Sequence, residues 1–281
     1  MKSPISIASA LADLEIKLKS AMTSDPRLES ELILSEAIGK PRLEMLLDKK
    51  QILSTAQNQN MNSILERRLK HEPLQYIFGK AYFRNIVLKV GTGVLVPRPE
   101  TEILVEHAIK LAPKNSEVLD IATGTGAIAL SLSQERPDLK VNASDISPVA
   151  LGYAKRNMRL NDIRKVKFLK VDLLKGIRRK FSVITANLPY INAKDYAALP
   201  CEIRRYEPRS ALIAGKDGLT FIRRLISTAH ESLEDGGHLI LEISPEQENP
   251  IKIIFDRSGK YYSIEFKKDL CGKIRFCILM K

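Results

Sequence analysis

The sequence contains little cysteine, and its spacing offers neither a cross-link nor a metal site. Cys201, Cys271 and Cys277 form an odd, scattered set without a Cys-x-x-Cys pair, which argues against a disulfide framework and against structural zinc. The four histidines show no His-Glu-x-x-His or other ligand spacing. We therefore expect a protein of the reducing cytoplasm that binds no metal.

Long apolar runs are also missing. No run approaches the ~18 residues that a membrane-spanning helix needs, and the start of the chain lacks the apolar core and cleavage site of a signal peptide. The sequence therefore predicts a protein that is neither exported nor embedded in a membrane. With 44% hydrophobic and 28% charged residues among 281, its composition is that of a folded globular protein.

The formal net charge of +12 is distributed unevenly. Between Lys155 and Lys180, eleven basic residues face only Asp162 and Asp172, which leaves a local net charge of +9. Such a stretch can attract an anionic partner at a rate that falls with salt. The other interpretation, a solvated surface without a specific partner, is the commoner outcome for an isolated charge run and stays open.

The N-terminal part, residues 1–75, has the three- and four-residue spacing of apolar side chains that is typical of helices. Asp25-Pro26 predicts the start of one helix and Gly39-Lys40-Pro41 its end, and another helix is expected from about residue 55 to residue 69. No chemically active groups converge in this part. We therefore expect a helical domain used for packing or substrate recognition.

Residues 76–98 predict a β-hairpin that links this domain to the rest. Between Tyr82 and Val96 apolar residues alternate with a period of two, interrupted at Gly91-Thr92-Gly93. The turn of the hairpin is expected at these glycines.

Residues 99–281 alternate short β-branched runs with helical segments, a pattern that requires parallel strands covered by helices on both faces. The last two apolar runs, near 261–266 and 273–280, are joined by a short polar link and should close the sheet edge as an antiparallel pair. The predicted fold class is thus α/β, a doubly wound sheet with its ligand site beyond the carboxyl ends of the first strands. The earlier expected strands are Glu117–Ile121, Lys140–Ala143, Val166–Val171, Phe181–Ala186 and His238–Ile243.

The first of these strands runs into a loop of small residues, Ala122-Thr123-Gly124-Thr125-Gly126, and then a helix start. Small residues let the backbone approach a ligand, and the helix start offers unpaired N–H groups. Asp145 stands 19 residues beyond Gly126, where a ribose-binding carboxylate belongs, and Asp172-Leu173 at the next strand end could hold a purine. Each acid alone is typical of a cap or turn, but together with the loop they favour a nucleoside-bearing ligand.

The fourth strand ends in Asn187-Leu188-Pro189-Tyr190. Pro189 biases residue 188 toward an extended conformation, so Asn187 Oδ1 and the Leu188 carbonyl could accept both hydrogens of a planar NH2 group on which Tyr190 stacks. Accepting both hydrogens localises electron density on the nitrogen and aligns it for attack on a methyl group. An Asn-x-Pro turn with a packing tyrosine is the alternative.

Several stretches spread over nearly the whole chain share the pattern of one family: Pro73–Gly79, Val96–Glu102, Asp120–Ala129, Asn187–Tyr190, Tyr206–Arg209, Ala211-Leu212, Asp217–Leu219, Leu241–Ile243 with Gln247, and Asp269–Phe276. Through them the chain resembles the bacterial HemK/PrmC family of protein-(glutamine-N5) methyltransferases, which modify peptide-chain release factors. That family has a helical N-terminal domain joined by a hairpin to a methyltransferase domain.

The resemblance implies S-adenosyl-L-methionine as methyl donor and, as substrate, the glutamine of the Gly-Gly-Gln loop of class-1 release factors. By motif position, residues 122–126, Asp145, Leu173 and Asn187 would line the cofactor site, and residues 187–190 would hold and activate the glutamine. A carboxamide is a planar NH2 group, so the resemblance agrees with the chemistry inferred from the residues. We further expect a monomer. The basic stretch 155–180 would bring it near the ribosome.

Two residues depart from the family pattern: Ala122 stands where glycine is usual, and Leu188 replaces the first proline of Asn-Pro-Pro-Tyr. Only the backbone carbonyl of residue 188 is needed, so leucine can serve. Asn-Leu-Pro-Tyr is also typical of ribosomal RNA adenine dimethyltransferases. Methylation of a nucleic-acid amine, glutamine methylation of a ribosomal protein, and ligand binding without turnover therefore stay as alternatives.

Overall fold

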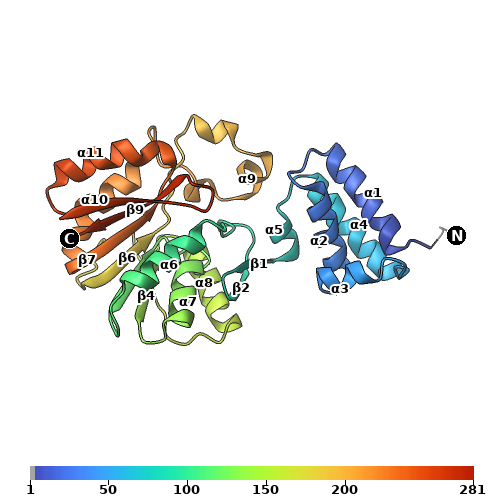
Figure 1. Cartoon of the computed structure of the whole chain (residues 1–281), viewed down its shortest axis with the longest axis horizontal. Helices are drawn as coiled ribbons and strands as arrows, with labels where there is room; N and C mark the ends of the chain where they lie inside the picture. The colour runs from blue at the N-terminus through green and yellow to red at the C-terminus, as the bar shows by residue number, and fades with distance from the viewer. Residues whose placement is uncertain (1–3) are drawn as a thin grey trace. The chain divides into compact units, whose positions relative to one another are not determined.

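The computed structural model describes residues 4–281, and the chain divides into two compact units. The first unit ends at Phe78, and the second runs from Gly79 to Lys281 (Figure 1). No helix in this described part is long and apolar enough to cross a membrane.

The first unit consists of helices whose ends are set by capping residues. Its helices are α1 (Ile7–Ser20), α2 (Pro26–Ile38), α3 (Arg42–Leu47), α4 (Thr55–Leu69) and α5 (Leu74–Phe78). Asp25 Oδ1 accepts a hydrogen bond from Leu28 N (3.0 Å) at the start of α2, and Gly39 ends this helix with a φ of 76°, as the sequence predicts. Buried apolar side chains of α1, α2 and α4 form the core of the unit.

The second unit combines a hairpin with a seven-stranded α/β sheet. The strands are β1 (Lys80–Phe83), β2 (Ile86–Lys89), β3 (Glu117–Ile121), β4 (Lys140–Asp145), β5 (Lys167–Lys170), β6 (Phe181–Ala186), β7 (Leu233–Glu242), β8 (Ser263–Lys268) and β9 (Ile274–Met280). The helices are α6 (Thr101–Leu111), α7 (Ala127–Glu135), α8 (Pro148–Leu160), α9 (Cys201–Tyr206), α10 (Thr220–Ser232) and α11 (Glu248–Ser258).

The sheet confirms the predicted doubly wound topology. Its strand order is β5-β4-β3-β6-β7-β9-β8. The first five strands in this order pair parallel, whereas β9 runs antiparallel to both of its neighbours, β7 and β8. Helices α10 and α11 lie on one side of the sheet, and α6, α7 and α8 lie on the other (Figure 1). The carboxyl ends of β5, β4, β3 and β6 therefore share one edge.

The hairpin turn was predicted at Gly91–Gly93, and this prediction is wrong. Strands β1 and β2 pair with Phe83 opposite Ile86, so the turn lies at the two residues between them. One of these, Arg84, has a φ of 47° and is held by an ion pair to Glu135 of α7 (Nε to Oε1, 2.5 Å). This contact offsets the cost of a left-handed backbone at a residue other than glycine.

The glycines at 91 and 93 serve close packing instead. A Cβ on Gly91 would lie 2.7 Å from Tyr153 Oη, and one on Gly93 would lie 2.9 Å from Val149 Cγ1. Both neighbours belong to α8, and Gly93 also has a φ of 95°, so the lack of side chains lets this segment run close to that helix.

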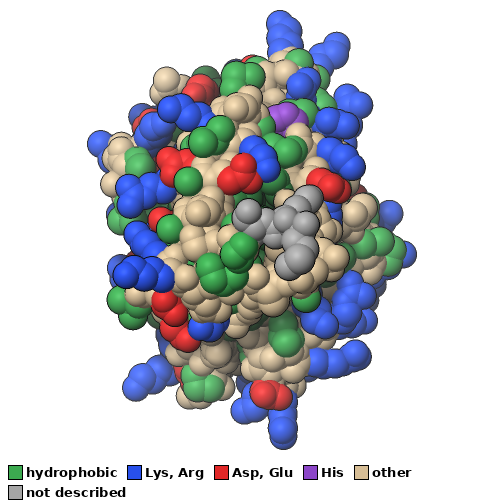
Figure 2. Space-filling model, turned by 90° about the vertical axis from the view of Figure 1, so that its right-hand side faces the viewer, with side chains coloured by type: hydrophobic (Ala, Val, Ile, Leu, Met, Phe, Trp, Pro, Cys, Tyr) green, Lys and Arg blue, Asp and Glu red, His purple; other side chains and the backbone are tan. Residues whose placement is uncertain are grey.

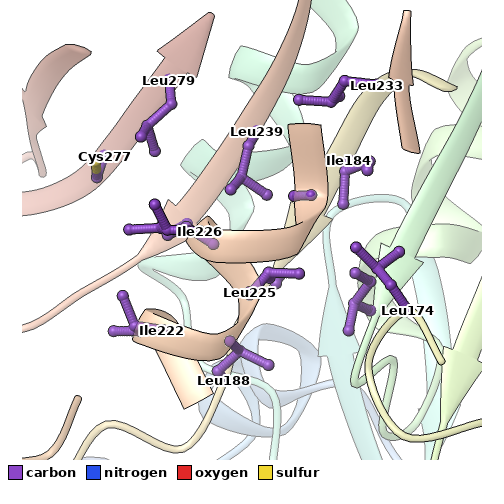
Figure 3. Close-up of a cluster of buried hydrophobic side chains, with 14 of the residues drawn as sticks. Leu174, Ile184, Leu188, Ile222, Leu225, Ile226, Leu233, Leu239, Cys277 and Leu279 are labelled. Carbon is purple, nitrogen blue, oxygen red and sulfur yellow. The ribbon is translucent and has the colours of Figure 1, made fainter. Parts of the chain in front are cut away.

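A large cluster of buried apolar side chains joins β6, β7 and β9 to α10 (Figure 3). Leu188, which follows β6, points into this cluster beside Ile222 and Leu225 and is only 2% exposed. The backbone that leaves β6 is therefore anchored in the core at this position.

Candidate active site

The predicted site residues gather at the shared edge of four neighbouring strands. Segments that follow β3, β4, β5 and β6 line a cavity of about 340 Å³. From the predicted set, its walls include Ala122, Thr123, Gly124, Thr125, Asp145, Leu173, Asn187, Leu188 and Pro189. Gly126 and Tyr190 are not among the residues that line it.

The loop after β3 turns through left-handed residues. Ala122, Gly124 and Gly126 have φ angles of 55°, 57° and 86°. At Gly126, a Cβ would lie 3.2 Å from Ala154 Cβ, so this glycine allows close packing of the loop on α8. Ala122 adopts a conformation that costs an ordinary residue about 1–2 kcal/mol. The turn is thus kept despite the extra methyl group.

Asp145, at the end of β4, holds this loop in place. Its Oδ2 accepts a hydrogen bond from Gly124 N (2.9 Å), and its Oδ1 accepts one from Ser147 N (2.8 Å). Burial raises the pKa of the carboxyl, and the bonds from these N–H groups oppose the rise. The carboxylate forms part of the cavity wall, where it can accept hydrogen bonds from ligand hydroxyls.

Asp120, inside β3, is a site residue to which sequence reasoning assigned no role. Its buried carboxylate accepts hydrogen bonds from Thr123 Oγ1 (2.6 Å) and Thr185 Oγ1 (2.9 Å). Burial raises its pKa to about 7, and the two threonine hydroxyls oppose the rise. Asp120 therefore connects the loop after β3, through Thr123, to β6, through Thr185. The available signal was an acid that stands between apolar residues of the strand.

The residues after β6 border two cavities. Asn187 and Leu188 line both the first cavity and a neighbouring one of about 410 Å³, whereas Tyr190 lines only the second. Burial raises the pKa of Tyr190 to about 12, and nearby Glu242 adds to the rise, so the phenol stays neutral. The Asn187 amide thus stands where a ligand in one cavity would meet a ligand in the other.

Asn187 is held from behind by two further residues. Its Nδ2 donates to Thr101 Oγ1 (3.2 Å), and the Thr101 hydroxyl donates to Glu242 Oε2 (2.7 Å). Within residues 4–281, neither Asn187 Oδ1 nor the Leu188 carbonyl accepts a hydrogen bond. Both oxygens that were predicted as acceptors are thus available to a ligand. Sequence reasoning assigned no role to Thr101 or Glu242, although both lie in family-like stretches.

Arg98 borders both cavities from the segment before α6. Its Nη2 contacts both carboxylate oxygens of Glu207, at 2.7 and 2.8 Å. The Glu207 side chain is 1% exposed, and burial raises its pKa while Arg98 opposes the rise. This ion pair connects the segment before α6 to the end of α9. Loss of either partner would be destabilising, because a buried carboxylate without a counter-charge is costly.

Comparison with known proteins shows relatives along nearly the whole chain. The family models PrmC N-terminal domain and Methyltransferase small domain match residues 9–79 and 99–200. The release factor glutamine methyltransferase of Thermodesulfovibrio yellowstonii is 40% identical over 258 residues, covering 90% of this chain and 92% of the relative. That of Coxiella burnetii is 35% identical over 277 residues, 98% of each chain.

Among solved structures, a methyltransferase from Pyrococcus furiosus aligns with a TM-score of 0.53 and 22% identity, covering 80% of this chain and 98% of that one. This similarity shows a shared fold. The similarity to the two bacterial relatives covers at least 90% of this chain and therefore extends over both units. The chain therefore belongs to the release factor glutamine methyltransferase family.

Proposed function

We propose that this protein transfers a methyl group from S-adenosyl-L-methionine to the side-chain nitrogen (N5) of the glutamine in the Gly-Gly-Gln motif of class-1 peptide chain release factors. Family membership supports the proposal, as do two cavities that meet at Asn187. The observation that carries it is the pair of available acceptors at this meeting point, Asn187 Oδ1 and the Leu188 carbonyl.

The first cavity suits S-adenosyl-L-methionine. Ala122 and Gly124 leave the loop backbone accessible, Asp145 offers acceptors for ribose hydroxyls, and Leu173 offers an apolar wall for a purine. Bound there, this cofactor supplies a methyl group activated by a positively charged sulfur. The full set of residues that would hold it is Ala122, Thr123, Gly124, Thr125, Asp145, Leu173 and Asn187, with Gly126 acting through the turn.

The second cavity suits a glutamine side chain. A carboxamide nitrogen is a poor nucleophile because its electron pair is delocalised. Asn187 Oδ1 and the Leu188 carbonyl accept its two hydrogens and orient it, while Pro189 fixes the backbone and Tyr190 packs on the amide plane. The nitrogen becomes acidic only after it gains the methyl group, so the proton leaves without a strong base.

The remaining parts would recognise the protein substrate. In this proposal the helical domain, residues 1–75, and the hairpin linker, residues 76–98, contact the body of the release factor, and the methyltransferase domain, residues 99–281, acts as a monomer. The eleven basic residues of the stretch 155–180 are all exposed and could bring the enzyme near ribosomal RNA. Figure 2 shows that Lys and Arg side chains also stand out on another face, on which the proposal for this stretch does not rest. If that stretch has no anionic partner, the transfer rate will depend only weakly on salt.

A substrate panel tests the proposal. The full chain is incubated with labelled S-adenosyl-L-methionine and, separately, with a release factor, ribosomal proteins or ribosomal RNA. We expect label on the release factor. Label on RNA alone would contradict the proposal in favour of nucleic-acid methylation. Label on a ribosomal protein alone would show that the substrate is that protein and not the release factor. Cofactor binding without transfer would indicate a binding protein.

The role of Asn187 is tested by Asn187→Ala. Removing one positioned hydrogen-bonding group at a reacting centre typically lowers kcat by about 10²–10³-fold, and we expect cofactor affinity to stay within a few-fold. Asn249→Ala is the matched control, since this residue is exposed on α11 and lines neither cavity. Equal loss of transfer and of cofactor affinity in Asn187→Ala would show that the residue serves the cofactor or the fold instead.

A further inference from the structure

A chain of hydrogen bonds leads from the Asn187 amide into the protein interior. Thr101, the first residue of α6, accepts from Asn187 Nδ2 (3.2 Å) and donates to Glu242, the last residue of β7 (2.7 Å). Thr101 is 4% exposed and Glu242 is 2% exposed. Three elements far apart in sequence thus converge behind the one amide that borders both cavities.

The direction of this chain follows from the chemistry of its members. An ionised carboxylate can only accept hydrogen bonds, so Glu242 takes the single proton of the Thr101 hydroxyl. The Thr101 oxygen then has only lone pairs left for Asn187, and it must receive an N–H group. Nδ2 is therefore directed at Thr101, and Oδ1 occupies the other arm of the planar amide, free of any bond within the described residues.

The opposite direction would block the reaction. If Glu242 carried a proton, it could donate to Thr101, and the threonine hydroxyl could then donate to Asn187 Oδ1. The amide would turn over and present its NH2 group to the substrate. Two NH2 groups cannot hydrogen-bond to each other through their donors, so a carboxamide substrate would lose one of its two acceptors.

We propose that Thr101 and Glu242 are positioning residues that hold the Asn187 amide with its oxygen toward the substrate. The effect of this orientation on catalysis rests on the proposed function. The charge of Glu242 sets the direction of the chain. Thr101 lines the first cavity and Glu242 lines the second. In this proposal both act on the reaction by orienting the Asn187 amide.

Glu242 is poised between its two protonation states. Burial raises its pKa to about 7, and the hydrogen bond from Thr101 and the charge of Arg275 oppose the rise. The amide direction should therefore change within the neutral pH range. Arg275 on β9, Glu100 before α6 and Tyr190 after β6 are charged or titratable groups near Glu242. Arg98, Asp195 and Glu246 line the same cavity as Glu242.

The first test compares Thr101→Val with Thr101→Ser. Valine keeps the shape but removes the hydroxyl, whereas serine keeps the hydroxyl. Losing one oriented hydrogen bond should lower kcat on the order of tenfold in Thr101→Val, with cofactor affinity and the KM for the release factor within about twofold. Thr101→Ser should stay within about threefold of the wild type. Full activity of Thr101→Val, or equal loss in both variants, would overturn the proposal.

The second test reads the amide directly, without substrate. The side-chain NH2 signal of Asn187 is recorded by ¹H–¹⁵N NMR of the full chain and assigned by its loss in Asn187→Asp. We expect this signal to shift with pH in the wild type, with a midpoint near pH 7, and to show no such shift in Glu242→Gln. This comparison also tests the proposal if Thr101→Val does not fold. A wild-type signal that ignores pH, or an unchanged titration in Glu242→Gln, would overturn the proposal.

The two tests separate this inference from the proposed function. If the wild type methylates no release factor but the Asn187 signal responds to Glu242 as described, the positioning chain stands and the substrate assignment fails. If the wild type methylates the release factor but the signal does not respond, the function stands and the positioning role fails.

Discussion

Leu188→Ala separates the two parts that residue 188 plays. The side chain is 2% exposed and packs among Ile222 and Leu225 of α10, whereas the backbone carbonyl is the second predicted acceptor for the substrate amide (Figure 3). Truncating a fully buried leucine to alanine typically costs about 2–5 kcal/mol, because the transfer free energy and the cavity add. The carbonyl remains. Stability should therefore fall while the chemistry survives.

The expected size of the effect can be measured by thermal unfolding. A loss of about 3 kcal/mol corresponds to a Tm about 6–12 °C lower for a unit of this size. Methyl transfer is then assayed well below the new Tm, per folded molecule, and kcat should stay within a few-fold of the wild type. Asn187→Ala should behave in the opposite way, with Tm nearly unchanged and transfer lost. A Leu188→Ala protein that melts normally but has lost transfer would refute the reasoning.

Further predictions concern the cofactor loop, the segment over α8 and the buried acids. Ala122→Gly should raise the unfolding free energy by about 0.5–1 kcal/mol, because relief of the positive φ exceeds the added freedom of the unfolded chain, and denaturant melts will show this. Gly91→Ala puts a Cβ 2.7 Å from Tyr153 Oη, so thermal unfolding should show a lower Tm, restored by adding Tyr153→Phe. Glu242 and Asp120 have folded pKa values raised to about 7, so between pH 4.5 and pH 7 the unfolded chain releases protons that the folded chain keeps. The free energy of unfolding should therefore fall as pH rises through this window. In Glu242→Gln this fall should be about 2–3 kcal/mol smaller than in the wild type, and an unchanged slope in that variant would contradict the raised pKa of Glu242.

The arrangement of the sheet was predictable because apolar periodicity reports burial directly. Small or polar residues, such as Ala122, Asp145 and Asn187, stand at the ends of several strands. Because these strands are parallel, their carboxyl ends share one edge of the sheet. The antiparallel pair at the C-terminus followed from the short link between its strands. These inferences depend only on local pattern and on the handedness of crossovers.

Features that depend on distant contacts were not predictable. At the turn, the guanidinium of Arg84 contacts Glu135, which lies far along the chain. The glycines at 91 and 93 pack against α8 instead. In the same way, Thr101 and Glu242 meet Asn187 only in the folded chain. A local pattern contains no signal for such pairings. The short helices α3, α5 and α9 were also missed, since elements of five or six residues show too few repeats to establish a period.

The central claim is that two oxygens of this chain hold a substrate carboxamide flat beside a methyl donor. A crystal structure of the protein with S-adenosyl-L-homocysteine and a Gly-Gly-Gln peptide tests it most directly. The account predicts the glutamine nitrogen within about 3.2 Å of both Asn187 Oδ1 and the Leu188 carbonyl oxygen. A glutamine bound with its nitrogen away from either oxygen, or with Asn187 Nδ2 turned toward it, would contradict the account.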